Sequence, residues 1–404
     1  MSDPGPLGPE GDDPFRGIPL FGDLARMLQQ QGPVNWDAAR QLAASIATEG
    51  ASEPNVDPLD RIQLEQLARV AELQVANATS LTTSPSGRGV SIVPVTRTVW
   101  MQKTLDAHRQ LFEALAGSLS GTQQMPTLSD DPEDLDDPMA KMLGGIMQAF
   151  SPVMLGMTIG SLLGHLARRS FGQYDLPIPR PPSDEIAFLL GNIDDFGNEW
   201  SLPKDDLRLW VCVHEVTRHA VLSVPHVRST LDSLLHRYVA GFEPDPNALE
   251  TRLGELDVSD PNALTKLPEL LGDPEVLLGA IQSPAQRELL PQLEAIVAVV
   301  VGYVDYVMDS VGEGLVGSYG MVTEALRRRR VTADPSDRFV ERLFGLELTQ
   351  AHYEHGAAFV HGVVERSGAD ALERLWKSER ELPTPAEIDA PGLWLARIDL
   401  PESG

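Results

Sequence analysis

The sequence contains a single cysteine, Cys212, in 404 residues. A lone cysteine excludes a disulfide within the chain, and it also excludes a zinc site built from several thiolates. Aromatic residues are scarce as well, at 6%, whereas alanine, leucine and valine dominate, which favours helices. We therefore expect a mainly α, multi-helix fold with at most a few short strands.

Positive charge is also in short supply. The chain has 32 lysines and arginines against 59 acidic residues, a formal net charge of -27. Phosphate backbones and anionic lipid surfaces repel so acidic a protein, so we expect neither nucleic acid nor a membrane surface as partner. The basic run Arg327 to Arg330 is interpreted as the solvated end of a helix, where cations complement the helix dipole.

Several sequence signals are missing. The first 15 residues have neither a basic region nor an apolar stretch, so no signal peptide is indicated and a cytoplasmic location is expected. There is no GxSxG motif, no phosphate-binding loop and no dinucleotide fingerprint. These absences leave helical patterns and one histidine motif to carry the interpretation.

Composition divides the chain into four parts. We predict a disordered tail over residues 1–20, an N-terminal helical region over 21–128, an acidic linker (SDDPEDLDDP) covering 129–138, and a helical core over 139–404. Apolar periodicity and capping residues predict one short strand within 84–95 and helices over residues 34–48, 57–78, 99–118, 142–167, 203–223, 226–239, 292–311 and 348–367.

Three glycines, Gly156, Gly160 and Gly164, recur every four residues in the uncharged run 142–167. They lie on one helix face and allow a second helix to approach closely. The run is long enough to span a bilayer, but Pro152 and His165 interrupt it, so we predict a buried helix without membrane insertion. An alternative function uses this face for assembly with another molecule.

The stretch VCVHEVTRHAVLSVPH, residues 211–226, nearly contains the HExxH zinc motif. In that motif, histidines four residues apart lie about 40° apart on one helix face, and the glutamate holds the attacking water. Here Arg218 stands four residues after His214, and His219 follows one residue late, about 140° around the helix. Because a guanidinium stays charged and repels a metal, the spacing predicts a degenerate site.

The sequence leaves two arrangements open. In the first, Arg218 occupies the metal position, no cofactor is bound, and Glu215 or Asp305 neutralises the guanidinium. In the second, His214, His219 and an acid such as Asp305 bind zinc, and Glu215 acts as the catalytic base that activates a zinc-bound water.

The chain also resembles a family of zincin-like hydrolases of unknown function, found mostly in high-GC Gram-positive bacteria. The resemblance covers most of the chain, in the family's order. It runs through FGDLARMLQQQGPVNWDAARQLA (21–43), the glycine-striped helix into LPIP, DDLRLWVCVHEVTRHAVLSVPHVRSTL (205–231), VVGYVDYVMDSVG (300–312) and GAAFVHGVVERSGADALERLW (356–376).

This resemblance implies a mainly helical, zincin-like fold for residues 139–404. In members with an intact motif, two histidines and a glutamate on one helix, plus a glutamate on a later helix, form a metallopeptidase-like site. By that pattern His214 matches the first ligand and Glu215 the base. Arg218 replaces the second histidine and Val301 the later glutamate, so the chain resembles a branch with a degenerate motif.

We therefore predict a non-catalytic homologue of zincin-like hydrolases and metallopeptidases that acts through binding or assembly. Its vestigial site comprises His214, Arg218, Val301 and Asp305, and its partner is an unidentified protein or peptide. The alternatives are an active zinc hydrolase or peptidase with the shifted His214 and His219 site, and a helix-packing assembly protein. The sequence indicates no oligomeric state.

Overall fold

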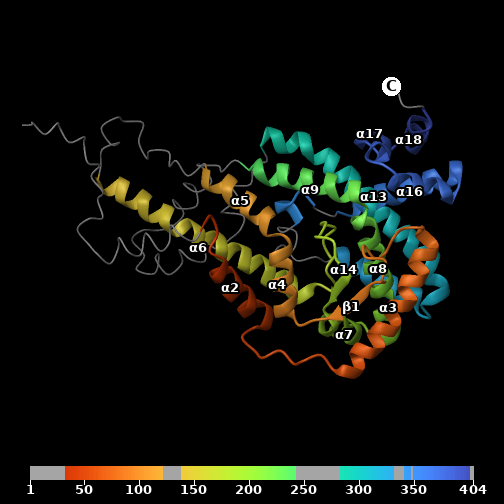
Figure 1. The fold of residues 1–404 in the computed structure, drawn as a ribbon, viewed down its shortest axis with the longest axis horizontal. Coiled ribbons are helices and arrows are strands. Elements are labelled where there is room, and N and C mark those ends of the chain that lie inside the picture. Colours follow the sequence, from red (N-terminus) through yellow and green to blue (C-terminus); the bar gives the residue numbers. More distant parts are fainter. Residues whose placement is uncertain (1–31, 122–137, 243–282, 332–340, 347–348, 401–404) are drawn as a thin grey trace, which may run out of the picture.

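A computed structural model describes residues 32–121, 138–242, 283–331, 341–346 and 349–400 (Figure 1). The predicted mainly α fold is confirmed. The strands are β1 (Ser91–Pro94) and β2 (Glu185–Phe188), and two short 3-10 helices are η2 (Ala369–Trp376) and η3 (Glu379–Glu381). The α-helices are α2 (Trp36–Thr48), α3 (Pro58–Thr79), α4 (Arg97–Ala107), α5 (Arg109–Gly121), α6 (Pro138–Arg169), α7 (Leu190–Glu199), α8 (Lys204–Ser223), α9 (Pro225–Ala240), α13 (Pro284–Leu315), α14 (Tyr319–Val331), α16 (Gln350–Ser367), α17 (Pro385–Ile388) and α18 (Pro391–Ile398).

Local capping explains where several helices begin. The side chain of Asn35 accepts a hydrogen bond of 2.9 Å from the amide of Ala38 and starts α2. Asp57 starts α3 in the same way, through the amide of Leu59 at 2.9 Å. The segment 99–118, predicted as one helix, divides at His108 into α4 and α5. Residues 243–282 lie outside the described residues.

The two strands form a parallel pair that supports the segment after α6. Ile92 of β1 and Ile186 of β2 are partners in this pair, and both side chains are buried. Gly172 forms a bridge with Phe188 at the end of β2, and its carbonyl accepts a hydrogen bond of 2.8 Å from the indole of Trp100. The strand pair therefore fixes residues 170–175, which form one wall of the candidate site.

The glycine face of α6 is covered by α2 of the same chain (Figure 1). A Cβ atom at Gly160 would lie 2.5 Å from the carbonyl oxygen of Ala39, and one at Gly164 would lie 2.7 Å from Cβ of Ile46. One at Gly156 would overlap the carbonyl oxygen of Asn35. The close helix contact is thus intramolecular. Because α2 covers the glycine face, this face is not available for the alternative function of assembly with another molecule.

The larger apolar residues of α3 are only partly buried. Leu64 and Val75 are fully buried, whereas Ile62, Val70 and Leu73 are exposed by 53%, 41% and 60%. Small residues, Ala68 and Ala71, contribute to the buried face instead. Because small side chains let α3 approach α8 closely, the buried face lies on the side of the helix opposite to these three larger apolar residues.

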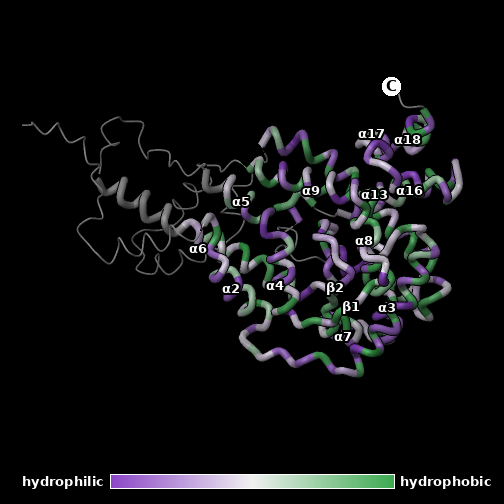
Figure 2. The backbone as a smooth tube through the Cα atoms, viewed as in Figure 1, coloured by the Kyte–Doolittle hydropathy of each residue, from purple (hydrophilic) through white to green (hydrophobic). Residues whose placement is uncertain are grey.

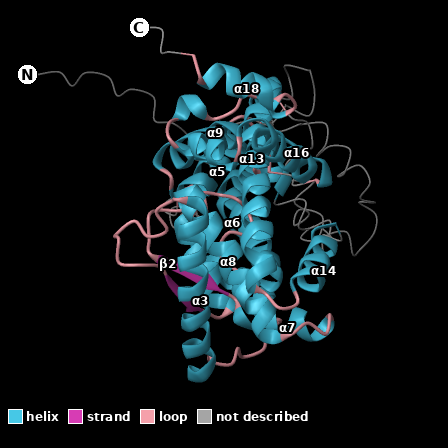
Figure 3. Ribbon diagram, turned by 90° about the vertical axis from the view of Figure 1, so that its right-hand side faces the viewer, coloured by secondary structure: helices cyan, strands magenta, loops and turns pink. Residues whose placement is uncertain are grey.

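Helix α13 runs through the centre of the molecule (Figure 3). It is long and apolar enough by composition to cross a membrane, yet 72% of its most apolar window is buried inside the protein, as in a core helix. Its Gly302 packs against the backbone of Gly356 in α16. Every residue of α13 from Ala295 to Val304 is buried, and Figure 2 gives the hydropathy of each residue along the helix.

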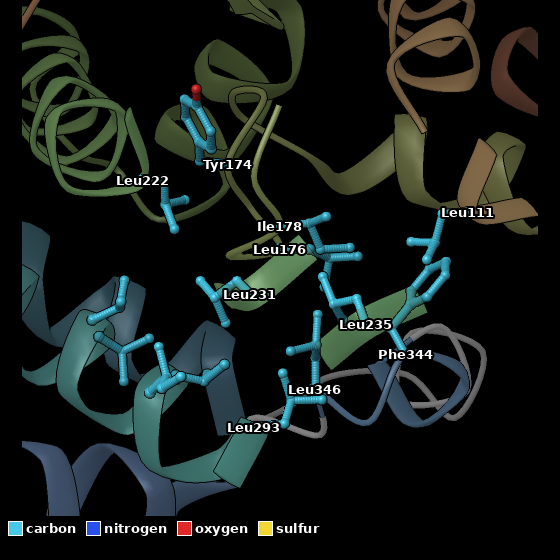
Figure 4. Close-up of a cluster of buried hydrophobic side chains, with 14 of the residues drawn as sticks. Leu111, Tyr174, Leu176, Ile178, Leu222, Leu231, Leu235, Leu293, Phe344 and Leu346 are labelled. Atoms are coloured by element: carbon cyan, nitrogen blue, oxygen red, sulfur yellow. The ribbon is translucent and has the colours of Figure 1, made fainter. Parts of the chain in front are cut away.

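One large hydrophobic cluster joins early and late parts of the chain. Figure 4 shows Leu111 of α5 close to Phe344, and Leu235 of α9 near Leu293 of α13. Side chains from before and after the predicted linker thus share this core. The predicted domain boundary stays a prediction, since residues 122–137 lie outside the described residues.

Candidate functional site

Helix α8 carries the histidine motif through the protein interior. It packs against α3, α13 and α14, and almost every residue from Leu207 to Leu222 is buried (Figure 1). Burial on all sides places charged side chains of this helix out of water, and each then needs a partner or a cavity.

A cavity of about 90 Å³ opens beside the motif. Four arginines and three carboxyl groups line it together with aromatic and aliphatic side chains. The lining residues are Arg169, Phe171, Asp175, Trp210, Val211, His214, Glu215, Arg218, Leu326, Arg329, Arg330, Glu341 and Tyr353. They come from α6, α8, α14, α16, and the segments 170–175 and 341–346, so the cavity depends on the whole tertiary fold.

His214 lies at one side of this cavity. Its ring stacks on the indole of Trp210, with centroids 4.9 Å apart and planes 20° from parallel. Nδ1 is 3.6 Å from Oε1 of Glu215, and Nε2 is buried without a hydrogen-bond partner among the described residues. Burial, followed by the charges of Arg218 and other nearby arginines, holds the pKa of His214 well below its usual value. The imidazole is therefore neutral at pH 7.

Glu215, the acid of the motif, is almost fully buried. Its Oε2 accepts a hydrogen bond of 2.9 Å from the amide of Tyr174, and its carboxyl lies directly against Gly172, where any Cβ atom would overlap it. Burial and the nearby charge of Asp175 raise the pKa of Glu215 to about 7, although Arg218 opposes this shift. The carboxyl group thus titrates near neutral pH.

Arg218 lines the same cavity as His214, which lies four residues earlier on α8. Its Nη1 donates to the backbone carbonyl of Tyr174 and, at 3.2 Å, to that of Asp175. Its Nε is buried and has no hydrogen-bond partner among the described residues. The guanidinium therefore fastens α8 to the segment after α6 through backbone carbonyls, and no carboxylate in the described chain pairs directly with it.

The remaining predicted site residues lie elsewhere. His219 is not part of the cavity lining; its Nδ1 lies 2.9 Å from the hydroxyl of Tyr174, and burial lowers its pKa to about 4. Asp305 forms a bidentate ion pair with Arg330, so the expectation that it neutralises Arg218 is wrong. Val301 is buried in the large hydrophobic cluster along α13 and does not line the cavity.

The arginine run 327–330 proved more important than the sequence indicated. Arg327 and Arg328 are exposed, as expected for a solvated helix end, but Arg329 and Arg330 turn inward and line the cavity. Arg329 lies 3.8 Å from the centroid of Phe171, and Arg330 lies 4.5 Å from that of Tyr353. The run of four arginines was the only sequence feature that could have indicated these cavity residues. Which of the four side chains point inward depends on how α14 packs.

The donor set does not fit the zinc site that the motif implies. Among the described residues, no group of three or more His, Cys, Asp or Glu side chains is close enough to share a metal ion. A guanidinium lies where the second histidine is expected, and the shifted grouping of His214, His219 and Asp305 is not assembled. The described residues that line the cavity offer hydrogen bonds and charged groups to a ligand.

Comparisons with known proteins agree with the resemblance seen in the sequence. Residues 34–395 match the model of a family described as zincin-like metallopeptidase. The fold is similar to the crystal structure of "a putative hydrolase with a novel fold" from Chloroflexus aurantiacus, with 25% sequence identity and a TM-score of 0.58. That match covers 91% of this chain and 100% of the other. The search of curated proteins found no match.

Proposed function

Because the chain belongs to the zincin-like metallopeptidase family, we propose that it is a non-catalytic member that acts through binding. The observation that carries this proposal is the position of Arg218. Its guanidinium lines the same cavity as His214, and two backbone carbonyls hold it there. A cation held at that point opposes the binding of a second cation.

Further features support the same conclusion. Asp305, the acid nearest in sequence to Val301, is held by Arg330, and Val301 itself is an apolar core residue. Among the described residues, no second histidine lines the cavity with His214, and no group of three or more His, Cys, Asp or Glu side chains could share a metal ion. Zinc bound by a single imidazole would be weak. The binding partner proposed is a protein or peptide, and no nucleic acid is expected for so acidic a chain.

Metal analysis tests the proposal. Protein purified without added metal should contain far less than one zinc per chain, and a His214→Ala variant should contain the same amount. The control is His361→Ala, which removes an exposed histidine from α16. Stoichiometric zinc that disappears in His214→Ala, but persists in His361→Ala, would show that the site still binds metal and would overturn the proposal.

A gain-of-ligand variant makes the test sharper. Arg218→His restores the four-residue spacing of the HExxH motif at the cost of the two carbonyl contacts. We expect zinc binding by Arg218→His to exceed that of the wild-type protein, since it removes the cation and adds an imidazole. Equal zinc affinity of both proteins would count against Arg218 as the residue that blocks metal binding.

A further inference from the structure

The cavity beside α8 has the chemistry of an anion site inside a strongly acidic protein. Four of its lining residues are arginines, although the chain as a whole carries a net charge of -27. A volume of about 90 Å³ accommodates a group of several heavy atoms, since one water needs roughly 10–15 Å³. A compact ligand fits this space, and a folded protein segment does not.

Three of the four arginines already form an ion pair with a carboxylate. Arg330 binds Asp305, Arg329 lies 3.4 Å from Asp175, and Arg169 lies 3.6 Å from Glu341, with distances measured between the charged atoms. These pairs hold their guanidinium groups in place. Arg218 differs, because its partners among the described residues are backbone carbonyls, which leave its positive charge without a paired carboxylate.

At the cavity, Nε2 of His214 and Nε of Arg218 are buried and have no hydrogen-bond partner among the described residues. The two residues are only 9% and 3% exposed, and they lie four residues apart on one face of α8. Leaving a buried polar group unpaired destabilises the protein, so such atoms can mark the position of a ligand. Both side chains line the same cavity.

Aromatic rings pack against the polar side chains that surround the cavity. Phe171 lies under Arg329, Tyr353 under Arg330, and Trp210 under His214. Stacked guanidinium groups lose little freedom when a ligand binds, so the site is preorganised.

We propose that this cavity binds a small carboxylate, which the Nε–Nη2 edge of Arg218 holds through two parallel hydrogen bonds. Nη1 is engaged with the carbonyls of Tyr174 and Asp175, so this edge is the part of the guanidinium left for a ligand. Its two N–H groups match the two oxygens of a carboxylate. A singly charged, planar anion also suits the presence of Asp175, Glu215 and Glu341, which would repel a dianion.

This inference deepens the proposed function and rests on it, because a zinc ion at His214 would occupy the same cavity. Calorimetric titration of the full chain with sodium acetate, at constant ionic strength set by chloride, tests it. We expect saturable binding in roughly the millimolar range, and none for acetamide, which has nearly the same shape without the charge.

Two variants locate the binding. Arg218→Gln should weaken acetate binding by about tenfold or more, and Arg218→Lys, which keeps the charge but loses the two-point edge, should also weaken it. Arg328→Gln makes the same charge change on the exposed side of α14 and should bind as the wild-type protein does. Circular dichroism checks that each variant folds, and if Arg218→Gln does not, Arg218→Lys decides.

Different results lead to different conclusions. Equal responses to acetate and acetamide, unchanged binding by Arg218→Lys, or tighter binding of inorganic phosphate would each overturn the proposal. N-acetylglycylglycine distinguishes the source of the carboxylate, because tighter binding of this peptide than of acetate points to the C-terminus of a peptide.

Zinc analysis of the same preparation separates the two hypotheses. Zinc-free protein that does not bind acetate contradicts only the carboxylate site, whereas stoichiometric zinc at His214 contradicts the proposed function.

Discussion

Arg330 of α14 binds Asp305 of α13 through two parallel hydrogen bonds, 2.9 Å from Nη1 to Oδ2 and 3.0 Å from Nη2 to Oδ1. The pair is three-quarters buried, with side chains 23% and 24% exposed. The pair holds Asp305 away from the motif on α8 and fixes Arg330 at the cavity. The same contact therefore removes a candidate metal ligand and contributes to the basic lining.

Breaking this pair should destabilise the protein. We expect Asp305→Ala to lower the free energy of unfolding by about 1–3 kcal/mol, because it leaves a largely buried guanidinium without its carboxylate partner. Urea unfolding of Asp305→Ala, Arg330→Met and the double variant measures the coupling, which should be at least about 0.5 kcal/mol. Asp232→Ala, a change of an exposed aspartate on α9, is the control. Additive effects of the two single changes would contradict a direct pair.

Glu215 should make stability depend on pH. Its pKa is raised from 4.5 to about 7 in the folded protein, so its neutral form favours folding below pH 4.5, and this contribution is lost as the pH rises through 7. Glu215→Gln cannot ionise. The variant should therefore gain stability relative to the wild-type protein between pH 5 and pH 8, by up to roughly 3 kcal/mol.

The comparison must use the difference between the two proteins. His214 and His219 have lowered pKa values, so their contribution acts the opposite way and is lost as the pH falls below their ordinary value of 6.5. Both proteins contain these histidines, and the effect largely cancels in the difference. Glu365→Gln, at an exposed position on α16, should show no such pH-dependent gain. A constant difference between wild-type and Glu215→Gln protein would mean that Glu215 titrates normally.

The sequence predicted those features that depend on neighbouring residues. The caps at Asn35 and Asp57 are made within three residues, so the starts of α2 and α3 could be predicted. The phase of Arg218 relative to His214 follows from helix geometry alone, and both residues do line one cavity. Local geometry was thus sufficient for the motif itself.

Features that depend on distant packing could not be predicted in the same way. Strand β2 is four residues long and is stabilised by a partner almost a hundred residues earlier in the chain. Consecutive arginines point in directions about 100° apart, so the run 327–330 cannot indicate which members turn inward. Only the packing of α14 selects Arg329 and Arg330, and this selection in turn assigns Asp305 its partner.

The contact between α2 and α6 can be tested at Gly160. A methyl group there would lie 2.5 Å from the carbonyl oxygen of Ala39 and 3.1 Å from its Cα, both backbone atoms that cannot move aside locally. We expect Gly160→Ala to lower the free energy of unfolding by about 1–3 kcal/mol. Gly117→Ala on α5 is the matched control. Its Cβ atom meets nothing within 4 Å, so alanine should stabilise that helix by up to about 1 kcal/mol. Similar effects of both changes would argue against close packing at Gly160.

Helix α3 offers a matched pair of leucines with opposite surroundings. Leu64 is fully buried in the cluster that includes residues of α8, whereas Leu73 is 60% exposed on the same helix. Both changes to alanine have the same effect on helix propensity, so the difference between them reports burial alone. We expect Leu64→Ala to lower the free energy of unfolding by about 2–5 kcal/mol and Leu73→Ala to change it by less than about 0.5 kcal/mol. Denaturant unfolding measures both, and a cost for Leu73→Ala comparable to that for Leu64→Ala would show that α3 is rotated relative to the orientation described, with the larger apolar residues facing the core.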